Sequence, residues 1–227
     1  MRTLALSLLL FLPAMPADVI QAKYAKKDVP LSADPKNSFW KGIAPVTGTK
    51  SNVGVDAPDF HLDIRARWTN ENLYVLMSCP FKELYVNANP VVDKETNKLW
   101  EHDVAEIFVG SDFDNIQRYR ELQVSPMGEW VDLDIDRKNP QPEGGWKWNS
   151  GMKVKARIDQ KAKIWYGEFQ IPLKSITDKK VNAGTMMRGN FYSFQGPAPN
   201  RNPVSWIPTG KPSNHMPEMF GKIEFVK

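Results

Sequence analysis

The chain has 227 residues, of which 41% are hydrophobic and 25% charged, as in an ordinary globular protein that can bury its own core. Its formal net charge is +4 at pH 7, and no block of lysine and arginine gathers in one stretch, which argues against nucleic acid as a partner. The 18 prolines, 8 tryptophans and 11 phenylalanines favour aromatic-rich strands joined by turns over a helical bundle.

The first 17 residues have the layout of a secretory signal peptide. Arg2 precedes an apolar run over residues 4–12, and small residues follow it up to Ala17. This run is too short to span a bilayer, and no later segment is long enough, so we expect no membrane span. Cleavage is expected after Ala17, or as late as Ala22, with export to the periplasm or the exterior. The predicted organisation is a signal peptide over 1–17, a lead-in over 18–28 and one domain over 29–227.

The rest of the chain is predicted to form short strands. Alternating apolar residues over 60–68 and a second strand-like run over 72–79 form a hairpin about a tight turn. Further hairpins are predicted over 119–136 and 152–171. Shorter strands follow at 190–195, 204–207 and 220–226. About ten strands with turn signals between them, and no long amphipathic helix, predict an all-β fold, an antiparallel β-sandwich.

Cys79 is the only cysteine, and it lies in the strand-like run 72–79. It cannot form an internal disulfide, and its apolar surroundings favour a small buried residue over a nucleophile. The core, helped by a bound cation if one is present, must therefore hold the domain together.

The stretch 99–110, LWEHDVAEIFVG, combines a large aromatic residue, carboxylates and a strand-forming run. A pyranose presents CH groups on its faces and hydroxyls around its equator, so a planar apolar ring beside carboxylates suits sugar recognition. We therefore predict Trp100, Asp103 and Glu106 as ligand-binding residues. The alternative is that Trp100 is an ordinary packing residue at the start of a strand.

Acidic residues gather in the turn 110–115 and along the strand 129–136. Calcium binds several carboxylate and carbonyl oxygens, and carboxylates two positions apart on one strand face repel each other at about 7 Å. A structural calcium ion would relieve this repulsion, as would a neighbouring arginine, and a solvated polar face is the alternative. The candidate metal ligands are Asp112, Asp114, Asp132, Asp134 and Asp136. The three histidines lack the spacing of a zinc site.

Four motifs in chain order resemble the family 9 carbohydrate-binding modules. An R-x-x-W hairpin ending in LYV spans 65–75, and a W-x-x-D-x-x-E-I-F block begins at Trp100. A late S-W pair stands at 205–206, and a terminal P-x-x-F-G-x-I-x-F strand begins at Pro217. The resemblance covers roughly residues 29–227.

This resemblance implies a β-sandwich that binds sugars, often at chain ends, in a slot between aromatic rings, and that carries structural calcium. It implies Trp100 as one wall of the slot and Glu106 as a hydroxyl acceptor. Gln123 stands where the family has an arginine, and Ser193 where it can have a glutamine. Similar modules are appended to secreted xylanases and other polysaccharide enzymes, which implies xylan or cellulose as ligand and a glycosidase as partner.

The sequence departs from the family at the second aromatic wall, just before the terminal motif. Asn214 and His215 stand there in place of a tryptophan, and the imidazole of His215 would offer a smaller stacking face. Other candidates for the second wall are Trp146, Trp148 and Trp206. The predicted ligand-binding set is Trp100, Asp103, Glu106, Gln123, Ser193, Asn214 and His215.

The sequence therefore predicts a secreted, non-catalytic domain that binds a mono- or oligosaccharide or a polysaccharide end. One alternative is a haem or redox module, because related sandwiches can hold haem between a methionine and a histidine and His215 adjoins Met216. Another is a glycoside hydrolase that uses Glu106 with Asp103 as its carboxylate pair.

Overall fold

The computed structural model describes residues 18–227, apart from the side chain of residue 143, and the predicted signal peptide over 1–17 lies outside them. Short 3₁₀ helices interrupt the connections between the strands. They are η1 (Ser38–Trp40), η2 (Leu99–Glu101), η3 (Pro142–Gly145), η4 (Leu173–Ser175) and η5 (Pro217–Met219). The strands are β1 (Val19–Tyr24), β2 (Val46–Gly48), β3 (Leu62–Trp68), β4 (Asn72–Pro80), β5 (Val104–Gly110), β6 (Arg118–Val124), β7 (Trp130–Asp136), β8 (Lys153–Asp159), β9 (Ile164–Pro172), β10 (Met186–Gln195), β11 (Asn202–Ser205) and β12 (Gly221–Val226).

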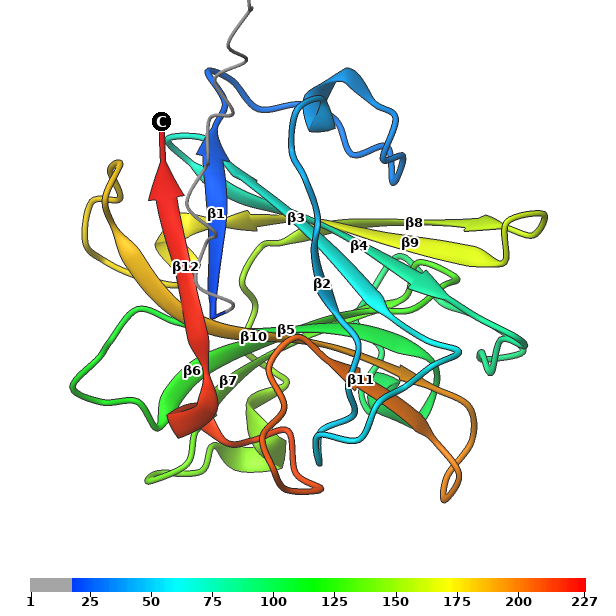
Figure 1. Cartoon of the computed structure of the whole chain (residues 1–227). Helices are drawn as coiled ribbons and strands as arrows, with labels where there is room; N and C mark the ends of the chain where they lie inside the picture. Colours follow the sequence, from blue (N-terminus) through cyan, green and yellow to red (C-terminus); the bar gives the residue numbers. More distant parts are fainter. Residues whose placement is uncertain (1–17) are drawn as a thin grey trace, which may run out of the picture.

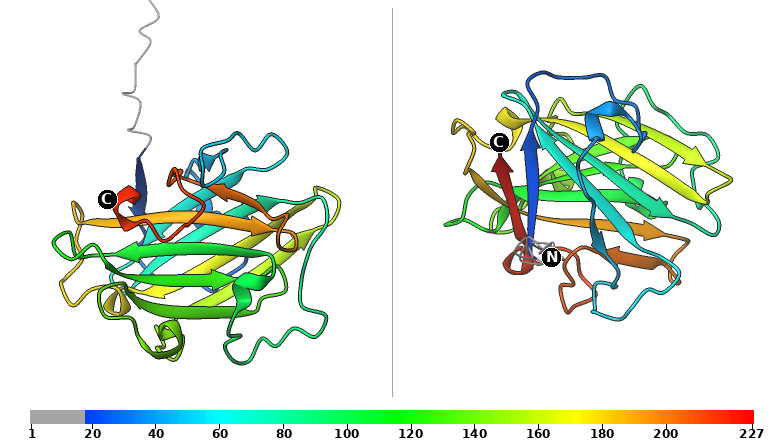
Figure 2. Two further views of the ribbon diagram at one scale, coloured as in Figure 1. Left: turned by 90° about the horizontal axis from the view of Figure 1, so that it is seen from below. Right: turned by 45° about the horizontal axis from the view of Figure 1, so that its top comes forward.

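The strands form a sandwich of two layers, as the sequence predicts (Figure 1). The hydrogen-bonded order is β7-β6-β5-β10-β12-β1-β3-β4-β9-β8, with β11 paired to β10 and β2 to β3. The layer β7-β6-β5-β10 faces the layer β3-β4-β9-β8, and β12 and β1 join them along one side (Figure 2). The three predicted hairpins, β3–β4, β6–β7 and β8–β9, are confirmed.

Strand β1 departs from the prediction in two ways. It lies within the segment 18–28, which is expected only as a lead-in, and it pairs parallel to both β12 and β3 rather than antiparallel. Ile20 and Ala22 on β1 are fully buried, so cleavage after Ala22 would cut through a core strand. This strand has no hairpin partner nearby in the sequence, and therefore no local pattern reveals its pairing.

The main core lies between the two layers and is built by the period-two alternation of strands. On β5, Ala105, Ile107 and Val109 face this core, whereas Phe108 belongs to a separate cluster with Tyr119 and Tyr192. Glu106 alternates with the same inward residues, so it shares the outer face of the layer with Phe108. This outer face carries the pocket described below. No helix in residues 18–227 is long and apolar enough to cross a membrane.

Candidate functional site

A pocket of about 390 Å³ lies on the outer face of the layer β7-β6-β5-β10. Strands supply its floor, and the connections 99–101, 196–201 and 206–216 bring in further side chains. The residues that line it, called here the Trp100 pocket, are Trp100, Glu106, Glu121, Leu133, Ile135, Gly144, Phe194, Arg201, Asn214 and His215.

Trp100 is held at the pocket by the short helix η2. The backbone of Lys98 is left-handed (φ 62°) and starts this turn, and Leu99 is fully buried as its anchor. The half-buried ring of Trp100 packs with the outer-face apolar cluster that includes Leu133, Ile135 and Phe194. The indole is therefore fixed beside the carboxylates of the strands, as the sequence predicts.

Two buried carboxylates, Glu106 on β5 and Glu121 on β6, share one amide donor. Gln123 Nε2 donates to Glu106 Oε1 at 3.0 Å and to Glu121 Oε1 at 2.6 Å. Burial and the neighbouring Glu121 charge hold the pKa of Glu106 well above its usual value, and burial raises the pKa of Glu121 to about 7. The pair therefore keeps a proton near neutral pH, so one carboxyl can donate a hydrogen bond while the other accepts.

The connection before β12 brings Asn214 and His215 to these carboxylates. Asn214 Nδ2 donates to Glu106 Oε2 at 2.9 Å, and the Tyr192 hydroxyl donates to the Asn214 carbonyl at 3.0 Å. The Tyr119 hydroxyl lies 2.7 Å from His215 Nδ1, and Phe108 packs against the imidazole with ring centroids 5.0 Å apart. Burial lowers the pKa of His215 to about 4, so its ring is neutral at physiological pH.

Arg201, in the connection between β10 and β11, lines one side of the pocket. Its guanidinium donates to the backbone carbonyls of Trp100 and His102, which ties this connection to η2. The guanidinium also lies over the Phe194 ring, 5.4 Å from its centroid. Arg201 Nε is buried and has no hydrogen-bond partner among the described residues. The pocket thus combines aromatic surface, paired carboxyls and a cationic donor, a set that suits a polyhydroxylated ring with apolar faces.

Three of the predicted ligand-binding residues do not line this pocket. Asp103 is fully buried, and its two oxygens accept the backbone N–H groups of Tyr85 and Gly196 at 2.9 and 2.7 Å. Gln123 is buried beneath Glu106 and Glu121 as their shared donor. Ser193 is buried in the sandwich, where it lies beside Gln195 and Cys79. The structure brings together Trp100, Glu106, Asn214 and His215.

Six lining residues are not among the predicted ligand-binding residues: Glu121, Leu133, Ile135, Gly144, Phe194 and Arg201. Glu121 stands two positions before Gln123 on a predicted strand, so the alternation of side chains would have placed it on the same face. Phe194 adjoins Ser193 on β10, so alternation places its side chain on the opposite face of the strand from Ser193. Arg201 reaches η2 across about a hundred positions of chain, and no local pattern in the sequence marks that contact.

The other tryptophans considered for a second wall lie outside the Trp100 pocket. Trp206 is buried edge-on against Phe191 in the main core. Trp148 stacks on the Arg120 guanidinium, 4.4 Å from its ring centroid. Trp146 packs with the same outer-face apolar cluster as Trp100 but does not line the cavity. Of the candidates weighed from the sequence, only His215 lines the pocket.

The five aspartates predicted as metal ligands do not form one group. Asp112 and Asp136 accept backbone N–H groups in their own turns, and Asp134 pairs with Arg118 and Arg120. Asp114 lies in the turn that Asp112 caps. Within residues 18–227 no group of three His, Cys, Asp or Glu side chains is placed to hold a metal ion.

Asp132 differs from the other four. Its Oδ2 accepts from the Ser150 hydroxyl at 2.5 Å, but its Oδ1 is buried and has no hydrogen-bond partner in the described part of the chain. Glu95, which is not among the predicted metal ligands, accepts the backbone N–H of Asp132, and its Oε2 is also buried with no hydrogen-bond partner among the described residues. Burial raises the pKa of both carboxyls. At Glu95 the charge of Asp132 adds to this effect, and the pKa of Glu95 rises to about 7.

The model of one protein family, the carbohydrate family 9 binding domain-like proteins, matches residues 34–227. The chain belongs to this family. The resemblance carried by the four sequence motifs is thereby confirmed, and the matched segment includes the complete Trp100 pocket. No curated protein matches the chain.

Solved structures share the fold of this family 9 domain. A family 9 module from Caldicellulosiruptor kristjanssonii in complex with cellotriose superposes with a TM-score of 0.62 at 16% identity, covering 92% of this chain and 93% of that one. The module from that organism in complex with glucose gives 0.61 at 15% identity, with 91% and 95% covered. A candidate carbohydrate-binding protein from Bacteroides uniformis gives 0.70 at 17% identity, with 92% and 99% covered.

Proposed function

We propose that this family 9 domain binds a carbohydrate, without catalysis of its own, in the Trp100 pocket. The observation that carries the proposal is the position of a fixed indole beside the paired carboxyls of Glu106 and Glu121 in a family 9 fold. The complexes of similar modules with glucose and cellotriose support the same ligand class. The haem and glycosidase alternatives gain no such support.

Each part of the pocket has a role in this proposal. The Trp100 ring stacks on the CH face of a sugar, and the paired carboxyls accept and donate hydrogen bonds at its hydroxyls. Arg201 Nε supplies a buried donor that has no other partner among the described residues. A cavity of about 390 Å³ holds one or two sugar rings, which favours a chain end over the middle of a long polymer.

Calorimetric titration with glucose, xylose, cellobiose and xylobiose tests this proposal. We expect dissociation constants on the order of micromolar to millimolar, as one stacking ring and a few hydrogen bonds allow. Trp100→Ala is expected to abolish measurable binding while leaving the circular dichroism spectrum unchanged. Trp148→Ala is the matched control, because it removes an indole that lies outside the pocket.

Two results would contradict the proposal. One is the failure of the intact domain to bind any mono- or oligosaccharide on a broad glycan array. The other is equal weakening of binding by Trp148→Ala and Trp100→Ala, because only one of these rings lines the cavity.

The finer assignments extend the same proposal. We propose that residues 1–17 direct export, that the ligand derives from xylan or cellulose, and that a glycosidase acts on the same polysaccharide. The sequence of the leader and the family membership support these assignments. Secretion of a fusion to a reporter enzyme tests the leader, and the relative affinities for xylobiose and cellobiose test the polymer.

For the expected calcium ion, we propose the neighbourhood of Asp132 and Glu95 as the binding place. Two buried carboxylate oxygens lack partners among the described residues there, and a divalent cation would stabilise the charged forms that burial disfavours. A chelator is then expected to lower the thermal midpoint of the native domain and Asp132→Asn to abolish that response. Asp112→Asn, which alters a turn, is the control. An unchanged midpoint in chelator would contradict the proposal.

A further inference from the structure

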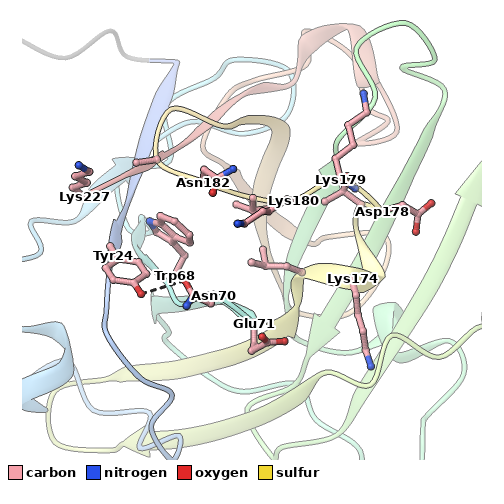
Figure 3. Close-up of a pocket in the computed structure, with 14 residues that line it drawn as sticks. Tyr24, Trp68, Asn70, Glu71, Lys174, Asp178, Lys179, Lys180, Asn182 and Lys227 are labelled. Carbon is pink, nitrogen blue, oxygen red and sulfur yellow. Dashed lines mark hydrogen bonds between the residues drawn. The ribbon is translucent and has the colours of Figure 1, made fainter.

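A second and larger pocket, of about 810 Å³, opens beside β1 and the end of β12 (Figure 3). The connection 173–183 forms one side of it, and the β3–β4 turn and the ends of β1 and β12 form the other. It shares no lining residue with the Trp100 pocket. We call it the lysine pocket and define it by Tyr24, Trp68, Asn70, Lys180, Asn182 and Lys227.

The aromatic side of the lysine pocket is rigid. Tyr24 and Trp68 meet edge to face, with ring centroids 4.8 Å apart and planes at 62°. Trp68 Nε1 donates to the Val226 carbonyl at 2.8 Å, and the Tyr24 hydroxyl donates to Asn70 Oδ1 at 3.2 Å. Trp68 is almost fully buried and Tyr24 is half-buried, so part of the Tyr24 ring remains open to a ligand.

The polar side of the lysine pocket is cationic. The cavity is lined by the lysines Lys174, Lys179, Lys180 and Lys227 and by the acidic side chains of Glu71 and Asp178. No ion pair of the described residues includes any of these lysines. Lys180 and Asn182 lie on the side that faces Tyr24 and Trp68, whereas the carboxylate of Asp178 and the ammonium groups of Lys174 and Lys179 point away (Figure 3). The cavity therefore places one exposed cation, Lys180, opposite the rings of Tyr24 and Trp68.

We propose that the lysine pocket binds an acidic sugar, a uronate residue of an oligosaccharide. A uronate combines a ring with apolar CH faces, hydroxyl groups and one carboxylate. Tyr24 contacts the ring, the amides of Asn70 and Asn182 bond its hydroxyls, and the ammonium group of Lys180 holds its carboxylate. The cavity is wide enough for a disaccharide.

Titration of the full chain with digalacturonate, with its neutral counterpart galactobiose as control, tests this proposal. We expect the charged disaccharide to bind and to weaken as salt rises, and the neutral one to bind more weakly by about tenfold or more. In amide-correlation spectra, digalacturonate is expected to shift the signals of Asn70, Lys180 and Asn182.

Three variants make this test specific. Lys180→Gln is expected to weaken digalacturonate binding about tenfold and to leave cellobiose binding unchanged. Lys161→Gln removes an exposed lysine on the β8–β9 turn and is expected to change neither. Trp100→Ala is expected to leave digalacturonate binding intact, so failure of the Trp100 pocket and failure of the lysine pocket are distinguishable.

Any of the following results overturns the proposal. They are no binding of digalacturonate, equal affinity for galactobiose, the same loss in Lys161→Gln as in Lys180→Gln, or loss of digalacturonate binding in Trp100→Ala. Inorganic sulfate that binds as tightly as digalacturonate would also overturn it, because the aromatic and amide groups would then contribute nothing.

Discussion

Glu106 and Glu121, on neighbouring strands of one layer, are held by the same amide nitrogen of Gln123. Two carboxylates that share one donor in a buried place cannot both ionise at low cost, so the pair retains a proton. The floor of the Trp100 pocket therefore carries both an acceptor and a donor, and its charge depends on pH.

Replacement of Glu121 by glutamine is expected to change how stability depends on pH. The folded protein keeps the Glu121 proton up to about pH 7, whereas the usual pKa is 4.5. The unfolded chain thus binds fewer protons between these values, and the free energy of unfolding falls as pH rises through them. Relative to Glu121→Gln, the native protein should lose at most about 1.4 kcal/mol per pH unit between pH 4.5 and 7.

Urea denaturation at several pH values measures this difference. Glu83→Gln, which replaces an exposed carboxylate, is the matched control. A constant difference between the native protein and Glu121→Gln from pH 4.5 to 7 would refute the assignment of a retained proton to this pair.

Replacement of Asp103 by alanine should weaken the fold rather than remove a ligand contact. Asp103 accepts the backbone N–H groups of Tyr85 and Gly196, which belong to two separate connections. Loss of both acceptors is expected to lower the free energy of unfolding by roughly 2–3 kcal/mol. Asp103→Asn keeps one acceptor oxygen and should lose less. Sugar binding by the folded fraction of Asp103→Ala should persist, and its complete loss would mean that Asp103 contacts the ligand.

Glu168 on β9 anchors the segment that precedes β2. It accepts the backbone N–H groups of Ser32 and Ala33, each at 2.6 Å, and the Trp40 indole N–H at 2.9 Å. Glu168→Ala is expected to cost roughly 3 kcal/mol of stability and to speed hydrogen exchange at Ser32 and Ala33.

Asp59→Ala provides the comparison for Glu168. It removes an exposed ion pair with Lys82, and such pairs contribute little. If Glu168→Ala were no more destabilising than Asp59→Ala, the three hydrogen bonds would have no anchoring effect.

Cys79 is expected to resist thiol reagents in the native protein. It is fully buried on β4, and burial raises its pKa to about 12, so almost no thiolate exists at pH 8. Labelling with an aromatic disulfide reagent should follow the rate of unfolding and become rapid in denaturant. Immediate stoichiometric labelling of the native domain would contradict this expectation.

The hairpins could be predicted because their signals are local. Alternation over β3 and the turn before β4 lie within about twenty residues, and the same is true of β6–β7 and β8–β9. Trp100 and Glu106 could be placed in one site for a similar reason, since a single turn and strand carry both. The pairing of strand β1 could not be predicted, because its partner strands are β3 and β12, which are distant in the sequence.

The rest of the site depends on contacts between distant segments. An aspartate such as Asp103 is a residue type that commonly binds sugar hydroxyls. Its hydrogen-bond partners here are backbone N–H groups of two connections, and nothing in the sequence places these connections near it. Arg201 reaches the pocket through carbonyl groups, which any residue can provide. The row Asp132, Asp134 and Asp136 shares one strand, yet the arginines of β6 and the hydroxyl of Ser150 divide it into separate environments.

The parallel pairing of β1 with β12 also governs how the chain reaches its native state. Gln21 donates to Glu224 across 203 positions, and Val19 is in register with Lys222. Among these strands β1 is made first and β12 last, so the seam between the two layers closes only after β12 has been made. Until then β10 and β1 keep exposed edges that invite pairing with other chains. A large loop must be ordered before this contact forms, which predicts slow, late folding of the seam.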